Sequence, residues 1–147
     1  MQTEPTSSTA STPPSSAIEV VQSFLAALQA KDLDRATSLM AEDIVYQNVP
    51  FPADRGKRAV LRTLNAFQRV VTGFEVRMHN IAERDGVVLT ERVDVLSGPF
   101  VYLDIWVCGT FEVKGGQITL WRDYFDLAEA TGKLLVGPIR KLLRRGH

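Results

Sequence analysis

Charged and hydrogen-bonding residues occur in segments whose other residues are typical of buried β-strands. Asp123 lies between Trp121 and Phe125 in one alternating segment, and Arg92 and Asp94 occupy alternate positions of an earlier one. Alternate residues of a strand point to the same face of a sheet, so both carboxyl groups are expected beside apolar side chains. Burial of a lone carboxylate is costly. Two acids and an arginine in this pattern favour a site for general acid–base chemistry.

Tyr46 and Asn48 add two hydrogen-bonding side chains on one face of a segment at residues 44–49. Taken singly, these residues have ordinary explanations, because strand charges usually face water and a buried tyrosine can simply satisfy its hydroxyl group. Nucleophilic catalysis is disfavoured, since Cys108 is expected to be a small buried hydrophobe and no histidine is placed to activate it. His79 is expected to be exposed.

The composition narrows the possible functions. The chain has 147 residues, 17 Lys and Arg against 17 Asp and Glu, a formal net charge of zero, and 45% apolar residues. These values are typical of one globular domain, and nucleic-acid binding is disfavoured because it requires excess positive charge. One cysteine excludes an internal disulfide, and two histidines leave few ligands for zinc. The apolar runs are too short to span a membrane.

Helical periodicity precedes the β-segments. Ser16 and Glu19 form a capping-box pattern that predicts a first helix. Asp32 can cap a short second helix, and apolar spacing predicts a third over residues 56–70. Residues 1–16 are rich in Ser, Thr and Pro and are expected to form a disordered arm. They lack the basic and apolar regions of a secretory signal, so we expect a cytoplasmic protein.

Four β-segments follow, at about 73–83, 86–96, 99–113 and 116–126. Short turns containing glycine separate them, and because short connections cannot join parallel strands, the segments are expected to form an antiparallel meander. Helices followed by a meander predict an α+β fold, with three N-terminal helices packed in the concave face of a curved, mixed and mostly antiparallel sheet. This domain is expected to cover residues 17–130.

Three motifs on separate strands carry a family resemblance. They are Tyr46-Gln47-Asn48, Glu91-Arg92-Val93-Asp94-Val95 and Trp121-Arg122-Asp123-Tyr124-Phe125-Asp126. In this order they resemble those of limonene epoxide hydrolases, over about residues 18–127. The resemblance implies a cone-shaped fold like that of nuclear transport factor and ketosteroid isomerase, and a homodimer. It also implies one-step epoxide hydrolysis with no metal, no cofactor and no covalent intermediate.

The resemblance further implies a role for each polar residue. Asp123 is expected to be the general base and to hold the attacking water with Tyr46 and Asn48. Asp94 is expected to be the general acid, and Arg92 to bridge the two carboxylates. With both acids ionised this group carries a charge of −1, and one shared proton makes it neutral, so desolvation favours retention of a proton. The pair is therefore expected to titrate as a unit.

The expected substrate is an uncharged, lipophilic epoxide that gives a vicinal diol, so its pocket must be apolar. The candidate wall residues, each of which could also be ordinary core, are Phe125, Ile105, Val107, Phe67 and Val76. The sequence leaves open whether the epoxide is a monoterpene or a bulkier steroid-like or fatty-acyl molecule.

A basic extension ends the chain. Residues 131–147 contain five Lys and Arg and no Asp or Glu. We expect a helical extension with one of two roles, either a surface or dimer-packing helix or a weak membrane-surface contact that gathers lipophilic substrate.

Two other functions remain open at this point. One is a proton-transfer isomerase, like ketosteroid isomerase, or a cyclase on the same fold, although an arginine between two acids argues against it. The other is a non-catalytic module that binds a hydrophobic ligand, since one fold can support many functions. A pure binder has little reason to bury two acids.

Overall fold

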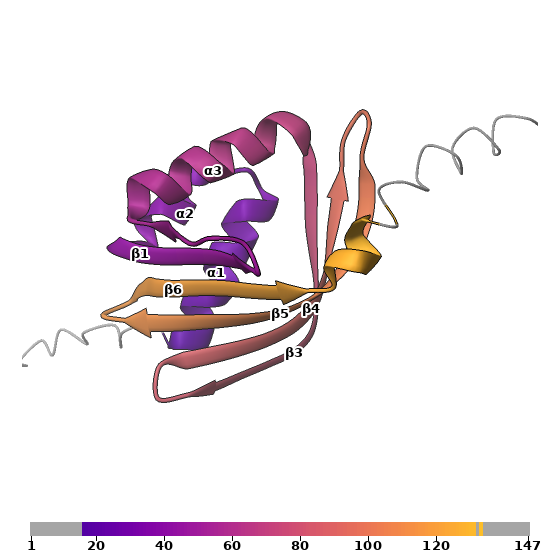
Figure 1. Ribbon diagram of the computed structural model, residues 1–147. Helices are drawn as coiled ribbons and strands as arrows, with labels where there is room; N and C mark the ends of the chain where they lie inside the picture. Colours follow the sequence, from indigo (N-terminus) through magenta and orange to yellow (C-terminus); the bar gives the residue numbers. More distant parts are fainter. Residues whose placement is uncertain (1–15, 132, 134–147) are drawn as a thin grey trace, which may run out of the picture.

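The computed structural model describes residues 16–131 and 133 (Figure 1). Its elements are, in chain order, α1 (Ala17–Gln29), α2 (Leu33–Ser38), β1 (Met40–Val49), β2 (Asp54–Arg55), α3 (Lys57–Val70), β3 (Gly73–Arg84), β4 (Val87–Ser97), β5 (Tyr102–Lys114) and β6 (Gln117–Phe125). A short helical segment follows β6. The expected N-terminal arm lies outside the described residues except for Ser16, and the basic extension except for Thr131 and Lys133.

The strands form one sheet in the order β2-β1-β6-β5-β4-β3. Strands β3 to β6 are the predicted antiparallel meander, and β1 joins β6 in parallel. The two-residue strand β2 is too short for periodicity to reveal it. Strand β5 begins at Tyr102 rather than near residue 99, because Gly98 donates its backbone N–H to the Val101 carbonyl and closes a turn there.

The helices begin where the capping residues predict. The Ser16 hydroxyl accepts the Glu19 backbone N–H at 3.2 Å, and the Asp32 carboxylate accepts that of Arg35 at 3.0 Å. Helix α1 packs against β3, β4, β5 and β6, while α3 packs against β1 and β2 (Figure 1). The helices thus lie on one side of a curved sheet, which confirms the predicted α+β fold.

The core lies between α1 and the inner face of the sheet. Phe24 on α1 packs edge-on against Trp121, with ring centroids 5.0 Å apart, and Phe111 stacks beside it. Strict alternation from Trp121 would put Ile118 on the outer face, but an irregularity in the β5–β6 pairing returns it to the core. No helix in the described ranges is long and apolar enough to cross a membrane.

Candidate active site

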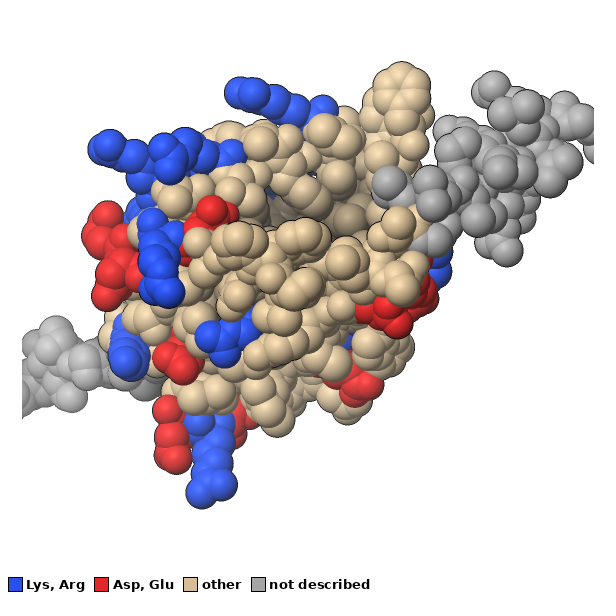
Figure 2. All heavy atoms as spheres, in the orientation of Figure 1, with Lys and Arg blue, Asp and Glu red and all other residues tan. Residues whose placement is uncertain are grey.

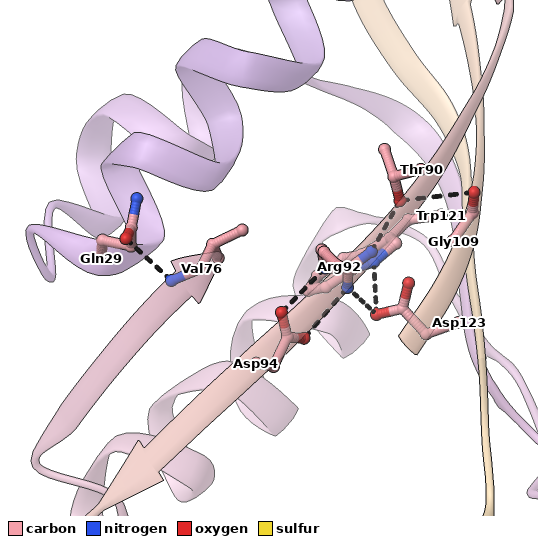
Figure 3. Close-up of polar contacts among 8 residues, drawn as sticks. All are labelled: Gln29, Val76, Thr90, Arg92, Asp94, Gly109, Trp121 and Asp123. Atoms are coloured by element: carbon pink, nitrogen blue, oxygen red, sulfur yellow. Dashed lines mark hydrogen bonds and ion pairs between the residues drawn. The ribbon is translucent and has the colours of Figure 1, made fainter. Parts of the chain in front are cut away.

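Arg92 lies at the centre of a buried ionic cluster on the inner face, which also contains Asp94 and Asp123 (Figure 3). Its Nε donates to Asp94 Oδ1 at 2.8 Å, and its Nη2 donates to Asp94 Oδ2 at 3.1 Å and to Asp123 Oδ2 at 2.8 Å. The side chain of Arg92 is 0% exposed, and those of Asp94 and Asp123 are 12% and 7% exposed. One guanidinium group therefore spans two carboxylates that come from different strands.

Two further side chains complete the cluster. Trp121 donates its indole N–H to Asp123 Oδ2 at 2.9 Å, and Arg92 Nη1 donates to Thr90 Oγ1 at 2.9 Å (Figure 3). The sequence did not predict either contact. In each pair, however, the donor and the acceptor lie two residues apart on the same strand, so alternation could have indicated that they share a face. Asp123 Oδ1 is buried and has no hydrogen-bond partner in the described part of the chain.

The parallel pairing of β1 with β6 brings Tyr46 and Asn48 to this cluster. Asn48 is the register partner of Asp123, and Tyr46 that of Trp121. The Tyr46 ring stacks on the Trp121 ring at 3.9 Å, and Asn48 Nδ2 donates to the Tyr46 hydroxyl oxygen at 2.6 Å. Burial, reinforced by the nearby Asp123 carboxylate, raises the pKa of Tyr46 above its ordinary value. Its hydroxyl group therefore keeps its proton and can donate it in a hydrogen bond.

Burial has the largest effect on the pKa values of the two acids. It raises the pKa of Asp94 and of Asp123, and the opposing attraction of Arg92 offsets this only in part. Burial by itself lowers the pKa of Arg92, but the two carboxylates outweigh it and raise that pKa, so the guanidinium remains charged. One cation faces two acids, and the excess negative charge favours retention of one proton on the carboxyl pair.

Four of the five predicted wall residues lie on the inner face of the sheet. They are Val76 on β3, Ile105 and Val107 on β5, and Phe125 on β6. Val76 and Ile105 flank Asp94 as its register partners on the two neighbouring strands. Phe67 lies on α3, is 38% exposed, and packs edge-on against Phe74 at the start of β3. It therefore lies toward the end of this face rather than beside the acids.

One face of the molecule carries little charge at its centre. Figure 2 shows uncharged atoms across the centre of one face, around a hollow between α3 and β6. Lys and Arg side chains gather along α3 above it, and acidic side chains lie toward the two ends of the view. An uncharged face of this kind suits an uncharged ligand.

The remaining candidates for chemistry lie on the outer face. His79 is exposed, as predicted, and its ring centroid is 4.9 Å from that of Trp106. Cys108 is also exposed, so its expected burial is wrong; the inner position beside it on β5 belongs to Gly109. Within the described ranges no three His, Cys, Asp or Glu residues gather as a metal ion would require.

Comparisons with known proteins find relatives that are similar in sequence and in fold. Residues 15–136 match the family model of the limonene-1,2-epoxide hydrolase catalytic domain. Epoxide hydrolase EphG of Mycobacterium tuberculosis (strain ATCC 25618 / H37Rv) is 44% identical over 119 residues, which are 81% of this chain and 79% of that protein. The solved structure of an M. tuberculosis LEH-like epoxide hydrolase matches with a TM-score of 0.79 and 43% identity, over 87% of this chain and 96% of its own. A SnoaL-like polyketide cyclase structure from Shewanella denitrificans OS-217 matches in fold alone, with a TM-score of 0.76 and 15% identity over 81% of this chain and 96% of its own.

Proposed function

The chain belongs to the limonene-1,2-epoxide hydrolase family, and we propose that it adds water to a lipophilic epoxide to give a vicinal diol, without a metal or a cofactor. The observation that carries this proposal is the buried guanidinium of Arg92 between the carboxylates of Asp94 and Asp123. Epoxide opening needs a nucleophile at carbon and a proton at the departing oxygen. Of two carboxyl groups that share one proton, the ionised one can activate water as the nucleophile while the protonated one supplies the proton, in a single step.

Asp123 is the general base in this mechanism, since it is the acid whose register partner is Asn48. The protonated Tyr46 hydroxyl donates to the water oxygen, while the water donates to Asp123 and to the Asn48 carbonyl oxygen. These three contacts leave one lone pair of the water free to attack carbon. Holding the nucleophile in this way is catalysis by positioning.

Asp94 is the general acid, since the apolar side chains of Val76 and Ile105 flank it where a substrate would lie. Protonation of one Asp94 oxygen releases that oxygen from Arg92 and makes it a donor toward the epoxide. As the water oxygen bonds to carbon, the epoxide carbon–oxygen bond breaks, Asp94 gives its proton to the departing oxygen and Asp123 accepts one from the water. The carboxyl pair ends with the same number of protons, and a transfer from Asp123 to Asp94 resets the site.

The substrate pocket is formed by the apolar residues around the acids. Val76, Ile105, Val107 and Phe125 line it on the sheet, and Phe67 on α3 lies toward its end, beside Phe74. Among these lining residues no charged group other than the ionic cluster is available to bind an ionic substituent. The preferred substrate is therefore an uncharged epoxide with a hydrophobic body.

A panel of terpene, steroid and fatty-acyl epoxides in ¹⁸O-labelled water tests the proposal. We expect at least one member to give a diol that carries a single label from the solvent. An unlabelled isomer as the product would replace hydrolysis by isomerisation. Tight binding of a lipophilic compound with no turnover on the whole panel would replace catalysis by ligand binding.

We also propose that the protein is a homodimer that associates through the outer face of its sheet. This face exposes large apolar side chains, with Leu89 55%, Trp106 42% and Tyr124 44% exposed. Leu89, Cys108 and Tyr124 also line a depression of about 320 Å³ on this face. Exposed apolar side chains grouped on one face are typical of protein interfaces, and a second copy of the chain would bury them.

For location we propose the cytoplasm, and for the basic extension a membrane-surface contact. The first of its basic residues, Lys133, donates to the carboxylates of Asp104 and Glu129 on the body of the protein. The other basic residues lie outside the described part of the chain. Co-sedimentation with anionic vesicles, compared between the full chain and a chain ending at Ala130, tests the contact, and equal partitioning would exclude it.

A further inference from the structure

The Arg92 side chain must cross a strand to reach both of its acidic partners. Arg92 and Asp94 lie on β4 and Asp123 lies on β6, with β5 between them. Neighbouring strands are about 4.8 Å apart, so the two acidic strands are separated by roughly 10 Å. The residue of β5 that pairs with both Thr90 and Asp123 is Gly109. The end of the guanidinium group therefore lies above a glycine.

A side chain at position 109 would collide with the ionic cluster. A Cβ atom there would lie 2.7 Å from Thr90 Oγ1 and 2.8 Å from Asp123 Oδ1, and it would also contact Arg92 Nη1. Cβ atoms in proteins essentially never come closer than 3.0 Å to such neighbours. The Gly109 backbone lies in regular strand, outside the left-handed region that favours glycine. Glycine is therefore required at position 109 because a larger residue has no room there, and not because of the backbone conformation.

We propose that Gly109 is a positioning residue for the hydrolysis, because its missing side chain lets Arg92 contact Asp94 and Asp123 at the same time. Thr90 anchors the guanidinium over this space by accepting from Nη1 at 2.9 Å, and its hydroxyl donates in turn to the Gly109 carbonyl at 3.5 Å. The catalytic consequence rests on the proposed function. The structural step, the crossing of β5 by Arg92, does not.

Alanine at position 109 is expected to leave the fold intact and to disturb the cluster. All three colliding atoms are the ends of side chains, which can move, and alanine is less costly than glycine in a strand. Among the residues that the structure describes, the ionisable groups that face Asp123 are Arg92 and Asp94 from β4 and Tyr46 from β1. If Arg92 withdraws, Asp123 loses the only cation among them, so its pKa rises further.

The first test is the pH profile of kcat/KM for Gly109→Ala. We expect kcat/KM to fall by about 100-fold, as for a small misplacement of catalytic groups, and the acid limb of the profile to move to higher pH. The control is Gly115→Asn in the β5–β6 turn, where a Cβ meets nothing within 4 Å and the φ of 59° suits Asn. Its profile should match that of the wild type. A uniform loss of activity in Gly109→Ala, with the acid limb unmoved, would overturn the proposal.

A second test does not depend on activity. The chain has two tryptophans, and the Trp121 indole N–H donates to Asp123, whereas Trp106 lies on the outer face. In ¹⁵N-labelled protein the Trp121 indole signal should follow the protonation of the carboxyl pair. We expect its midpoint at higher pH in Gly109→Ala than in the wild type. An unchanged midpoint would contradict the positioning role even if the protein hydrolyses no epoxide.

A double-mutant comparison shows whether Gly109 acts through Arg92. In an Arg92→Lys background the guanidinium is gone, so Gly109→Ala should add no further shift to the Trp121 indole titration. Equal shifts in both backgrounds would mean that Gly109 acts independently of Arg92. If Gly109→Ala alone does not fold, recovery of folding in the double mutant would support the proposal, and failure in both backgrounds would refute it.

Discussion

The two faces of the central strands differ in a way that reverses the usual distribution of residues. On β4, Arg92 and Asp94 point inward and are buried, while Glu91, which directly precedes Arg92, lies on the outer face. The same outer face exposes the large apolar side chains of Leu89 and Trp106. Charges are buried where an apolar core is expected, and apolar groups are exposed where charges are expected. Each departure therefore needs a reason other than the stability of the monomer.

Different reasons apply to the two faces. A buried ionic cluster contributes little net stability, because desolvation of its charges offsets their attraction. Its value lies in the chemistry that low polarity permits, since desolvation is what retains a proton on the carboxyl pair. The outer apolar groups lose contact with water only if another molecule covers them. The proposed function assigns catalysis to the inner face, and the proposed dimer assigns association to the outer face.

The largest expected difference between the faces is in activity. Asp123→Asn removes the proposed base of the inner face and should lower kcat by about 10³-fold or more, in the upper half of the usual range for general acid–base catalysis. Glu91→Gln, the matched change on the outer face, should leave kcat within about twofold. Both variants should keep the circular dichroism spectrum of the wild type. An Asp123→Asn enzyme with most of its activity would show that the base is another residue.

The second contrast is between a buried and an exposed arginine, and it concerns the stability of the folded protein. Arg92→Met leaves two buried acids without their cation and should lower the free energy of unfolding by about 3–5 kcal/mol at neutral pH. Arg77 pairs with Glu75 on the outer side of β3, where both side chains are 55% exposed. Arg77→Met should hardly change the denaturation midpoint. Urea unfolding of both variants measures the difference, and equal losses would mean that the inner cluster is more solvated than its burial indicates.

Sequence reasoning located the inner face of the acid-bearing strands but not its full chemistry. Alternation placed Arg92 with Asp94 and Trp121 with Asp123, because a pleated strand requires it. Strands β1 and β6 pair in parallel although they are far apart in the sequence. No local pattern therefore reveals that Asn48 lies beside Asp123.

Strand β5 shows why the exposure of Cys108 and the importance of Gly109 could not be predicted from the sequence. It carries apolar residues on both faces, so its sequence alone does not say which face is inner, and Cys108 was placed in the core although it is exposed. The importance of Gly109 depends on which residues face it from the two neighbouring strands. Only the pairing register supplies that information.

The third contrast concerns association through the outer face. Leu89→Lys puts a charge at the centre of the proposed dimer interface and should raise the dimer dissociation constant by about 30-fold, as for a moderate interface hot spot. Sedimentation equilibrium over a concentration series measures this constant. The control is Leu61→Lys on α3, which changes the same residue type on the opposite side of the sheet. A wild-type chain that is monomeric at all concentrations would exclude the interface.

The smallest expected effect is the pH dependence of stability, which should have opposite sign on the two faces. Burial raises the pKa of Asp123 above its ordinary value of 3.8, so the folded state binds its proton more tightly than the unfolded state does. Its contribution to stability is therefore greatest below that value and is lost as pH rises through the folded-state pKa.

On the outer face, a hydrogen bond from Lys133 lowers the pKa of Asp104, so its contribution is present above 3.8 and is lost as pH falls. Thermal denaturation from pH 3 to 8 should therefore show that Asp123→Asn gains stability relative to the wild type as pH rises. Asp104→Asn should show the reverse trend. The same trend in both variants would mean that burial does not control the titration of Asp123, and the retained proton that the mechanism requires would then need another source.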